Sequence, residues 1–333
     1  MRKIKIAVYS PNWVGDAAQA LPFIHELKSQ NPEAKIIIVC KDWVESVFLH
    51  NPCIDDIVSL SANDVKGVIN TISTGISLRK KKIDYFYTLT DSFRSSVIMW
   101  LSNAIYRVGY NTQKRAKLLT VSVPFPSTRL HRTNKYLNLI GKEKTQFGQK
   151  YIYLKKSEID WAESLMRKRN INSPIAILPF SVADSRTFPK DKVKEWLSRS
   201  PDQYVVFGSK GDISSAKKII EQNKGVSVHS FCGDFSLRQS IALISLCRYA
   251  IATDSGLGHI SSILGVPTIS FFGAGVSDIT KPIGANSILL NKNVSCSPCN
   301  KNICYNYENP LLCIHEITKS DVNYAIKSLH LDS

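Results

Sequence analysis

The sequence of 333 residues has no apolar run near the roughly 20 residues that a membrane-spanning helix requires. Its basic and then apolar start ends at Ser10-Pro11-Asn12, too early for the hydrophobic region of a signal peptide. We therefore expect a cytoplasmic protein. Disorder is excluded as well, because 44% of the residues are hydrophobic and 21% are charged, which is an ordinary globular composition.

Several signatures of common enzymes are also missing. There is no Gly-x-Gly-x-x-Gly fingerprint and no Walker lysine, which argues against an ordinary dinucleotide site or a P-loop NTPase. No Asp-x-Asp pair is present to hold a divalent ion on a diphosphate, and no Gly-x-Ser-x-Gly nucleophile elbow occurs. Any catalytic chemistry must therefore lie in other motifs.

Positive charge is abundant and unevenly distributed. The formal net charge is +16, and residues 1–170 hold 27 Lys and Arg against 14 Asp and Glu. The segment 79–135 alone has 12 basic and 2 acidic residues. Such a patch attracts anionic partners such as phosphorylated lipid headgroups, nucleic acid or acidic sugars. For any single lysine, a solvated surface is the simpler interpretation.

Short apolar runs that end in turn residues alternate with helical segments, as in a helix expected over Ala17–Gln30. The alternation predicts an α/β protein with two doubly wound, Rossmann-like parallel sheets facing a cleft. We place the domain boundary at residue 158, which gives domains 1–158 and 159–333. The predicted strands are Ile4–Tyr9, Ala34–Cys40, Asp55–Leu60, Ile83–Leu89, Pro174–Pro179, Tyr204–Gly208, Tyr249–Thr253 and Thr268–Phe272.

The loop after the first predicted strand reads Asn12-Trp13-Val14-Gly15-Asp16. Ligands of doubly wound sheets bind at the carboxyl ends of the strands, where this loop is expected. Gly15 allows close approach of a ligand, and Asp16 can act as a general base for a sugar hydroxyl. From the loop alone, a helix N-cap at Asp16 is the simpler interpretation.

Two further loops suit a phosphate. In Thr253-Asp254-Ser255-Gly256-Leu257-Gly258-His259, between a strand and a helix, the helix dipole favours a phosphate or sugar oxygen, and His259 can face the same site. A capped helix with a buried histidine is equally consistent with that loop. The Ser181 hydroxyl and the Arg186 guanidinium follow another predicted strand and suit a diphosphate. The alternative is a surface loop with a solvated arginine.

Four of the eight cysteines cluster as Cys296-x2-Cys299-x4-Cys304-x8-Cys313. The spacing is consistent with a structural zinc or iron ion, although its middle interval is irregular for zinc families. Disulfides and a metal-free cluster are the alternatives. A catalytic metal is not expected there, because four thiolates leave no open position. The other cysteines are scattered among apolar residues, as reduced core thiols are.

Taken together, these segments resemble family nine of the glycosyltransferases, the bacterial ADP-heptose:lipopolysaccharide heptosyltransferases. The similarity covers most of the chain in the expected order. It runs through Asn12-Trp13-Val14-Gly15-Asp16, Asp91-Ser92-Phe93-Arg94-Ser95, Arg186-Thr187-Phe188-Pro189, Gly233-Asp234-Phe235-Ser236-Leu237, Asp254-Ser255-Gly256-x-x-His259, Phe272-Gly273 and the Cys-Ser-Pro-Cys segment.

The resemblance implies the two-domain GT-B fold, an ADP-heptose donor and inversion without a catalytic metal, and the absent Asp-x-Asp pair agrees with this. It implies that Asp16 is the catalytic base, that Phe235 packs on the adenine, and that Arg186 replaces a lysine on the diphosphate. Asp212 is the nearest candidate for the ribose-binding carboxylate. Further donor contacts are implied for Ser181, Asp254, Ser255, Gly256 and His259, and acceptor contacts for Asn12, Trp13, Gly15, Ser92 and Arg94.

The predicted function is transfer of heptose from ADP-heptose to the lipopolysaccharide inner core, with no cofactor required for catalysis. The basic N-terminal half is expected to bind the anionic acceptor, with peripheral contact to the inner membrane surface and no nucleic acid. One alternative is a family member with another nucleotide sugar or a protein acceptor. A non-enzymatic nucleic-acid-binding protein is another, although the interleaved aromatic residues of such modules are missing. A membrane-surface adaptor is the third.

Overall fold

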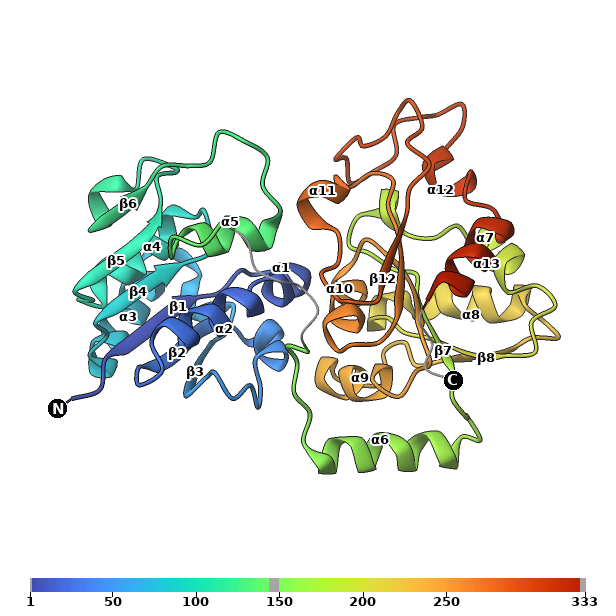
Figure 1. Ribbon diagram of the computed structural model, residues 1–333, viewed down its shortest axis with the longest axis horizontal. Coiled ribbons are helices and arrows are strands. Elements are labelled where there is room, and N and C mark those ends of the chain that lie inside the picture. The colour runs from blue at the N-terminus through green and yellow to red at the C-terminus, as the bar shows by residue number, and fades with distance from the viewer. Residues whose placement is uncertain (1, 144–149, 330–333) are drawn as a thin grey trace. The chain divides into compact units, whose positions relative to one another are not determined.

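The computed structural model describes residues 2–143 and 150–329 and divides the chain into two compact units (Figure 1). Unit 1 is Met1–Gln146 and unit 2 is Phe147–Ser333. Each unit is built on a six-stranded sheet whose neighbouring strands are parallel and are joined by helices. The predicted α/β class with two doubly wound sheets is therefore confirmed.

In unit 1 the strand order is β3-β2-β1-β4-β5-β6. The chain runs outward from β1 to β3 and then crosses back to β4, so β1 and β4 flank the point where ligands of such sheets bind. The loops after these two strands carry the predicted acceptor residues. The strands are β1 (Lys5–Tyr9), β2 (Lys35–Lys41), β3 (Asp56–Leu60), β4 (Tyr85–Thr88), β5 (Tyr106–Tyr110) and β6 (Val121–Val123).

The helices of unit 1 cover both faces of its sheet. Right-handed crossovers place α3 and α4 on one face and α1 and α2 on the other, where α5 packs against both. The helices are α1 (Val14–Gln19), α2 (Leu21–Gln30), α3 (Gly67–Ser77), α4 (Phe93–Leu101) and α5 (Arg132–Asn138).

The single helix predicted over Ala17–Gln30 is wrong, because α1 ends at Gln19 and α2 begins at Leu21. Pro22 explains the break. It has no backbone N–H, and its ring opposes the carbonyl four residues earlier. Proline is tolerated in the first turn of a helix, which is where it stands in α2.

In unit 2 the strand order is β12-β11-β10-β7-β8-β9. The central strands β7 and β10 are buried throughout, which explains why they appear in the sequence as uninterrupted apolar runs. The strands are β7 (Ile175–Leu178), β8 (Gln203–Val206), β9 (Ser227–Ser230), β10 (Ala250–Thr253), β11 (Thr268–Phe271) and β12 (Ser287–Leu290).

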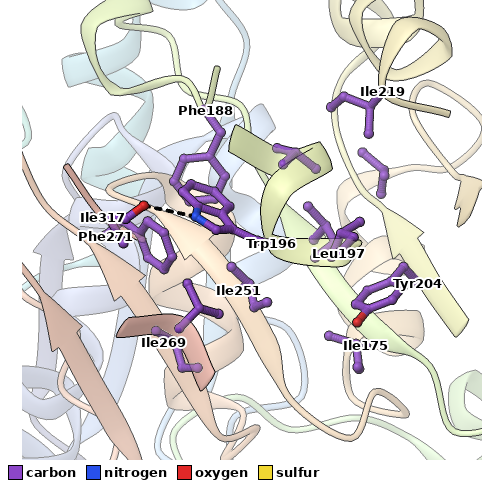
Figure 2. Close-up of a cluster of buried hydrophobic side chains, with 14 of the residues drawn as sticks. Ile175, Phe188, Trp196, Leu197, Tyr204, Ile219, Ile251, Ile269, Phe271 and Ile317 are labelled. Atoms are coloured by element: carbon purple, nitrogen blue, oxygen red, sulfur yellow. Dashed lines mark hydrogen bonds between the residues drawn. The ribbon is translucent and has the colours of Figure 1, made fainter. Parts of the chain in front are cut away.

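An aromatic cluster lies at the core of unit 2 (Figure 2). The rings of Trp196 and Phe271 are 4.7 Å apart between centroids, and Phe188 lies 5.1 Å from Trp196. The buried Trp196 indole donates to the carbonyl of Ile317 at 3.1 Å. The helices that pack in this core are α7 (Lys190–Leu197), α8 (Ile213–Gln222), α12 (Leu312–His315) and α13 (Lys319–Ser328). Unit 2 also contains α6 (Lys156–Lys168), α9 (Leu237–Ile244), α10 (Gly256–Ile263) and α11 (Ser277–Thr280).

The boundary between the units falls at residue 146 and not at the predicted residue 158. The Tyr151 N–H donates to the carbonyl of Ile263 at 3.1 Å, and Arg238 forms an ion pair with Glu158 at 2.7 Å. These contacts attach the segment ahead of α6 to unit 2. Among the helices of the described residues, none has the length and hydrophobicity needed to cross a membrane.

Candidate active site

Three of the predicted donor-binding residues meet at the carboxyl edge of the sheet in unit 2. Ser181 follows β7, and Asp254 directly follows β10, which is the neighbour of β7. The Ser181 hydroxyl donates to the Asp254 carbonyl at 3.4 Å, and Arg186 Nη1 lies 3.0 Å from Asp254 Oδ2. The Thr253 hydroxyl donates to the Arg186 carbonyl and ties the two loops together. Parallel strands that end at one edge therefore bring these residues into one cluster.

The Asp254 carboxylate is enclosed by its surroundings. Its side chain is 4% exposed, and His259 Nε2 lies 3.7 Å from its Oδ1 atom. A Cβ on Gly275 would lie only 2.1 Å from Asp254 Oδ2, so a glycine is required where that loop passes. A buried carboxylate needs a compensating cation, which Arg186 supplies.

Two fully buried polar atoms of this cluster, Arg186 Nε and Asp254 Oδ2, have no hydrogen-bond partner within the part of the chain that the structure describes. The Arg186 guanidinium and the Asp254 carboxylate are close, but they are not aligned as a hydrogen bond. Buried polar atoms without partners are costly, and they point to a group that is bound in use. A phosphate oxygen has the chemistry to accept from an arginine at this position.

The N-terminus of α10 lies directly beside this cluster. Ser255 caps the helix, and its hydroxyl accepts from the Gly258 N–H at 3.5 Å. A Cβ on Gly258 would lie 2.8 Å from the Thr253 carbonyl, so this glycine lets the helix start close to β10. The helix N-terminus, which begins at Gly256, adds a partial positive charge beside Arg186. The capped-helix and phosphate-site interpretations of this loop are therefore compatible.

Asp212 has a local structural partner. Its carboxylate accepts from the N–H and the hydroxyl of Ser209 at 2.7 and 2.6 Å and caps a 3-10 turn after β8. A Cβ on Gly208 would lie 2.7 Å from the Phe180 ring and 3.0 Å from Asp212 Cβ, so the loops after β7 and β8 are in contact. Asp212 thus lies near the Ser181 loop, and its ribose contact stays a prediction.

Phe235 belongs to an aromatic group beyond the carboxyl end of β9. Its ring is 5.6 Å from Trp161 of α6 and 5.2 Å from Phe231 between centroids. The Arg169 guanidinium lies 5.5 Å from the Phe235 ring centroid. The ring is half-buried, and its adenine contact stays a prediction.

In unit 1, Asp16 stands in the first turn of α1 beside an arginine that sequence analysis missed. Arg132 Nε, on α5, lies 3.5 Å from Asp16 Oδ1. The Thr133 hydroxyl donates to the Gln19 carbonyl at 3.0 Å and fixes α5 against α1. Arg132 is one of many basic residues in its segment, and nothing in the local pattern marks it as the partner of Asp16.

Burial and the charge of Asp16 determine the protonation states of Arg132 and Tyr136. Burial lowers the pKa of Arg132, but the charge of Asp16 and the neighbouring Tyr136 and Asp91 outweigh it, so the pKa is raised above its ordinary value. The pKa of the fully buried Tyr136 is raised well above its ordinary value, by burial first and then by the Asp16 charge. Arg132 therefore stays cationic beside Asp16 and Tyr136 stays neutral.

The rest of the loop after β1 offers exposed binding groups. The Asn12 carbonyl accepts from the Trp43 indole at 2.7 Å, which anchors the loop to the segment after β2. Trp13 is 62% exposed, although tryptophan usually covers apolar surface. Gly15 is the residue before Asp16 in the first turn of α1. The positions of Asn12, Trp13 and Gly15 are consistent with acceptor contacts, and those contacts stay a prediction.

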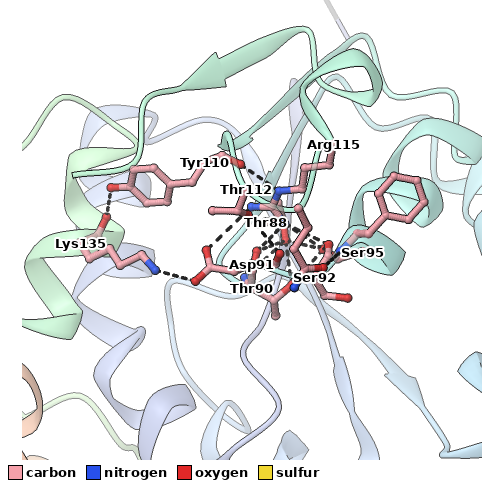
Figure 3. Close-up of polar contacts among 11 residues, drawn as sticks. Thr88, Thr90, Asp91, Ser92, Ser95, Tyr110, Thr112, Arg115 and Lys135 are labelled. Carbon is pink, nitrogen blue, oxygen red and sulfur yellow. Dashed lines mark hydrogen bonds and ion pairs between the residues drawn. The ribbon is translucent and has the colours of Figure 1, made fainter. Parts of the chain in front are cut away.

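The loop after β4 is held by a buried arginine, Arg115 (Figure 3). Arg115 is fully buried and donates to the carbonyls of Thr90 and Ser92 at 2.7 and 3.0 Å. Asp91 pairs with Lys135 at 2.7 Å and lies 4.0 Å from Arg115. Burial lowers the pKa of Arg115, and the Asp91 charge opposes that shift.

The predicted acceptor residues Ser92 and Arg94 lie in or next to this loop, which Arg115 holds in place. Arg94 is exposed in the first turn of α4, whereas the Ser92 carbonyl is engaged by Arg115. Since β1 and β4 are adjacent, the Asp16 loop and the Ser92 loop leave the same edge of the sheet. Unit 1 therefore gathers its predicted acceptor and catalytic residues at one edge.

The four clustered cysteines line one small cavity in unit 2. All four are free thiols. The Asn306 amide lies 3.6 Å from Cys296 Sγ, and the Leu311 N–H donates to Cys304 Sγ at 3.3 Å. Burial, followed by the charges of the other three thiols, raises the pKa of Cys313 to about 11. No three Cys, His, Asp or Glu side chains of the described residues are placed as a ready set of metal ligands.

Comparison with known proteins shows which protein family this chain resembles. The profile of the family described as glycosyltransferase family 9 (heptosyltransferase) matches residues 72–308. The chain is 22% identical over 298 residues to lipopolysaccharide heptosyltransferase 2 of Salmonella typhimurium, which covers 84% of this chain and 86% of the relative.

Solved structures agree on the fold. Heptosyltransferase II of Escherichia coli superposes with a TM-score of 0.78 at 21% identity and covers 98% of both chains. A family 9 glycosyltransferase from Veillonella parvula superposes with a TM-score of 0.84 at 21% identity and covers 99% of this chain and 98% of that one. The chain is therefore a glycosyltransferase with the two-domain GT-B fold, and it belongs to glycosyltransferase family 9, the heptosyltransferase family.

Proposed function

We propose that this glycosyltransferase moves heptose from ADP-heptose to the inner core of lipopolysaccharide, with inversion at the anomeric carbon and without a catalytic metal ion. The observation that carries the proposal is the Arg186 guanidinium, whose buried Nε donor has no hydrogen-bond partner among the described residues and can donate to a diphosphate oxygen. The Salmonella relative is a lipopolysaccharide heptosyltransferase, and the E. coli structure is that of an ADP-heptose enzyme. Both names support the proposed acceptor, and the name of the E. coli structure also supports the proposed donor.

The donor diphosphate would be held by unit 2. Arg186 supplies a charge-assisted hydrogen bond, and the N-terminus of α10 supplies partial positive charge next to it. The Ser181 hydroxyl lies close enough to Asp254 to reach the same phosphate group. Together these groups would stabilise the charge that develops on the leaving ADP, a role that a divalent ion has in other transferases.

The acceptor would react at the edge of unit 1. Asp16 takes the proton of the acceptor hydroxyl while the hydroxyl oxygen forms its bond to the anomeric carbon. The bond from that carbon to the diphosphate oxygen breaks, and ADP leaves with the electron pair. A single displacement of this kind inverts the anomeric centre. Arg132 would be a positioning residue, because it contacts the Asp16 carboxylate and can orient it.

The proposed acceptor is anionic and anchored in a membrane, so the enzyme would work at the inner face of the cytoplasmic membrane. The basic segment 79–135 lies in unit 1, beside the residues assigned to the acceptor. Positive charge there would raise the local concentration of an anionic acceptor.

We also propose that Cys296, Cys299, Cys304 and Cys313 hold a structural zinc or iron ion. Four sulfur donors around one cavity match the ligands that zinc and iron prefer. N–H groups that point to two of the sulfurs are the outer contacts expected of metal thiolates. Since no three of the described side chains already form a ligand set, the cysteine side chains would have to rotate to complete one.

Nucleotide binding by calorimetry tests the donor assignment, with ADP, UDP and GDP compared. We expect selective ADP binding that falls by about tenfold or more in Arg186→Ala, because one charge-assisted bond is lost. Arg167→Ala is the matched control, since Arg167 is an exposed arginine of α6 paired with Glu163. Preference for UDP or GDP would overturn the donor, and absence of nucleotide binding would overturn the proposed transfer. Transfer assays with lipopolysaccharide and protein acceptors would then separate the acceptor classes.

A further inference from the structure

Helix α3 in unit 1 turns its apolar side to solvent. Val68, Ile69, Ile72 and Ile76 are 75, 81, 39 and 45% exposed. At about 100° per residue, these four positions fall within an arc of roughly 100° on the helix surface. A helix that covers a sheet normally directs such an arc toward the core. The outward arc of α3 is therefore available to a partner.

The inner side of α3 is made of small and polar residues. Thr71 and Thr74 are buried, and their hydroxyls donate to backbone carbonyls at 2.7 and 2.6 Å. A Cβ on Gly75 would lie 2.5 Å from Leu101 Cβ, so α3 approaches α4 as closely as a glycine permits. Rotation of α3 would replace Gly75 by a larger side chain at this contact. The packing thus holds the apolar arc outward.

Helix α4 adds two exposed aromatic residues. Phe93 and Trp100 are 47 and 52% exposed, and since they are seven positions apart they share one side of the helix. The two helices pack side by side on one face of the sheet, and the Arg79 guanidinium donates to the Leu101 carbonyl at 2.8 Å across their junction. We call the combined surface the outer apolar face; it consists of Val68, Ile69, Ile72, Ile76, Phe93 and Trp100.

Positive charges surround the outer apolar face. Lys66 directly precedes α3, and Arg79 and Lys80 directly follow it, all of them exposed. The sequence has no Asp or Glu between residues 65 and 83 or between residues 92 and 142. An apolar centre with a basic rim has the chemistry of a surface that binds anionic bilayers.

We propose that the outer apolar face docks on an anionic lipid bilayer, with α3 lying along the headgroup region and the basic rim against the lipid phosphates. With 11 residues, α3 is too short to span a bilayer and can only lie along it. The inference deepens the proposed function, on which it rests for the identity of the membrane. A second copy of the chain suits this face less well, because two antiparallel α3 helices would bring Lys66 against Lys80.

Co-sedimentation with vesicles tests the docking surface, with phosphatidylcholine alone compared with phosphatidylcholine that contains phosphatidylglycerol. We expect the wild type to bind the anionic vesicles, and the Val68→Asn/Ile69→Asn variant to bind at least about tenfold more weakly, because buried apolar area is lost. Both side chains are exposed, so the fold should tolerate the changes. Tyr324→Asn is the control, since Tyr324 is 75% exposed on α13 of unit 2.

A second pair of variants tests the basic rim. Lys66→Glu/Lys80→Glu should weaken binding to anionic vesicles by about fivefold or more for each lysine, and added salt should weaken binding of the wild type in the same direction. Lys217→Glu/Lys218→Glu makes the same change in net charge on α8 of unit 2 and should bind as the wild type does.

Three outcomes would overturn the docking surface. They are an absence of binding to anionic vesicles, equal binding by the wild type and both unit 1 variants, and a concentration-dependent dimer that the Val68→Asn/Ile69→Asn change abolishes without vesicle binding. Transfer to a deacylated acceptor in solution separates this inference from the proposed function. The surface variants should keep this transfer activity. If the wild type binds vesicles but does not transfer heptose to the deacylated acceptor, only the proposed function is refuted.

Discussion

Arg132 Nε lies 3.5 Å from Asp16 Oδ1, which joins the first helix of unit 1 to its last. The contact is one-third exposed or less on each side, so water screens it only in part. It orients the carboxylate at the carboxyl edge of the sheet, where the acceptor is proposed to bind.

Asp16→Asn should lower kcat by about 100-fold or more, because an amide cannot accept the proton of the acceptor hydroxyl. ADP binding should stay as it is in the wild type, since the proposed donor contacts are all in unit 2. Steady-state transfer and calorimetry measure the two quantities. Asp160→Asn, an exposed site on α6, is the control. Unchanged turnover in Asp16→Asn would remove Asp16 as the base.

Arg132→Ala should lower kcat by about tenfold while the KM for the donor stays constant, because Arg132 positions Asp16 and does not touch the donor. Arg132→Lys should restore part of the rate, since it keeps the charge but loses the fixed geometry of the guanidinium. A purely structural role would instead lower the amount of folded enzyme with kcat intact, which active-site titration would reveal.

Arg186→Ala should destabilise unit 2 by about 3 kcal/mol, because it leaves the Asp254 carboxylate buried without its cation. The value is at the lower end for a buried pair, since Arg186 is itself 31% exposed. Adding Asp254→Asn should recover much of the loss by removing the buried charge. Urea unfolding measures both variants. A double variant no more stable than Arg186→Ala would contradict the pairing.

The stability of unit 1 should fall as the pH drops below about 6.5. Burial lowers the pKa of His25 below its ordinary value of 6.5, and the bond to Asn51 opposes this only in part. At His25 the unfolded chain therefore binds a proton more readily than the folded chain does. The stability that the neutral His25 contributes to unit 1 is complete above pH 6.5 and is lost as the pH falls. Urea unfolding at several pH values measures it, and His25→Gln should flatten the profile. An identical profile in that variant would assign the dependence to other groups.

Protein purified without chelator should contain about one zinc or iron ion per chain, bound by the four clustered cysteines. Cys299→Ser should lower the metal content, whereas Cys53→Ser, at an isolated cysteine of unit 1, should leave it unchanged. Elemental analysis measures the content. Clearly less than stoichiometric metal in the wild type would refute the proposed ion, and titration of free thiols would then report any disulfide.

Most of the central strands could be predicted because buried parallel strands appear as continuous apolar runs, as in Lys35–Lys41 and Ala250–Thr253. The strands that were missed are β5 and three of the four edge strands, β6, β9 and β12. Tyr106–Tyr110 mixes buried and exposed positions, and Val121–Val123 and Ser227–Ser230 are short edge strands. A strand with one neighbour needs few apolar residues, so its pattern is weak.

The sequence by itself determined the α/β class, the family resemblance and the loops at strand ends, because these depend on local patterns and on the rule that parallel strands end at one edge. Only the tertiary structure decided which side chains meet. It brought Arg132 to Asp16, paired Arg186 with Asp254 and buried Arg115 under the Ser92 loop. It also turned the apolar arc of α3 outward, because Gly75 fits against α4 and a larger residue does not. Such contacts depend on how elements distant in sequence pack, and local patterns carry no information about that.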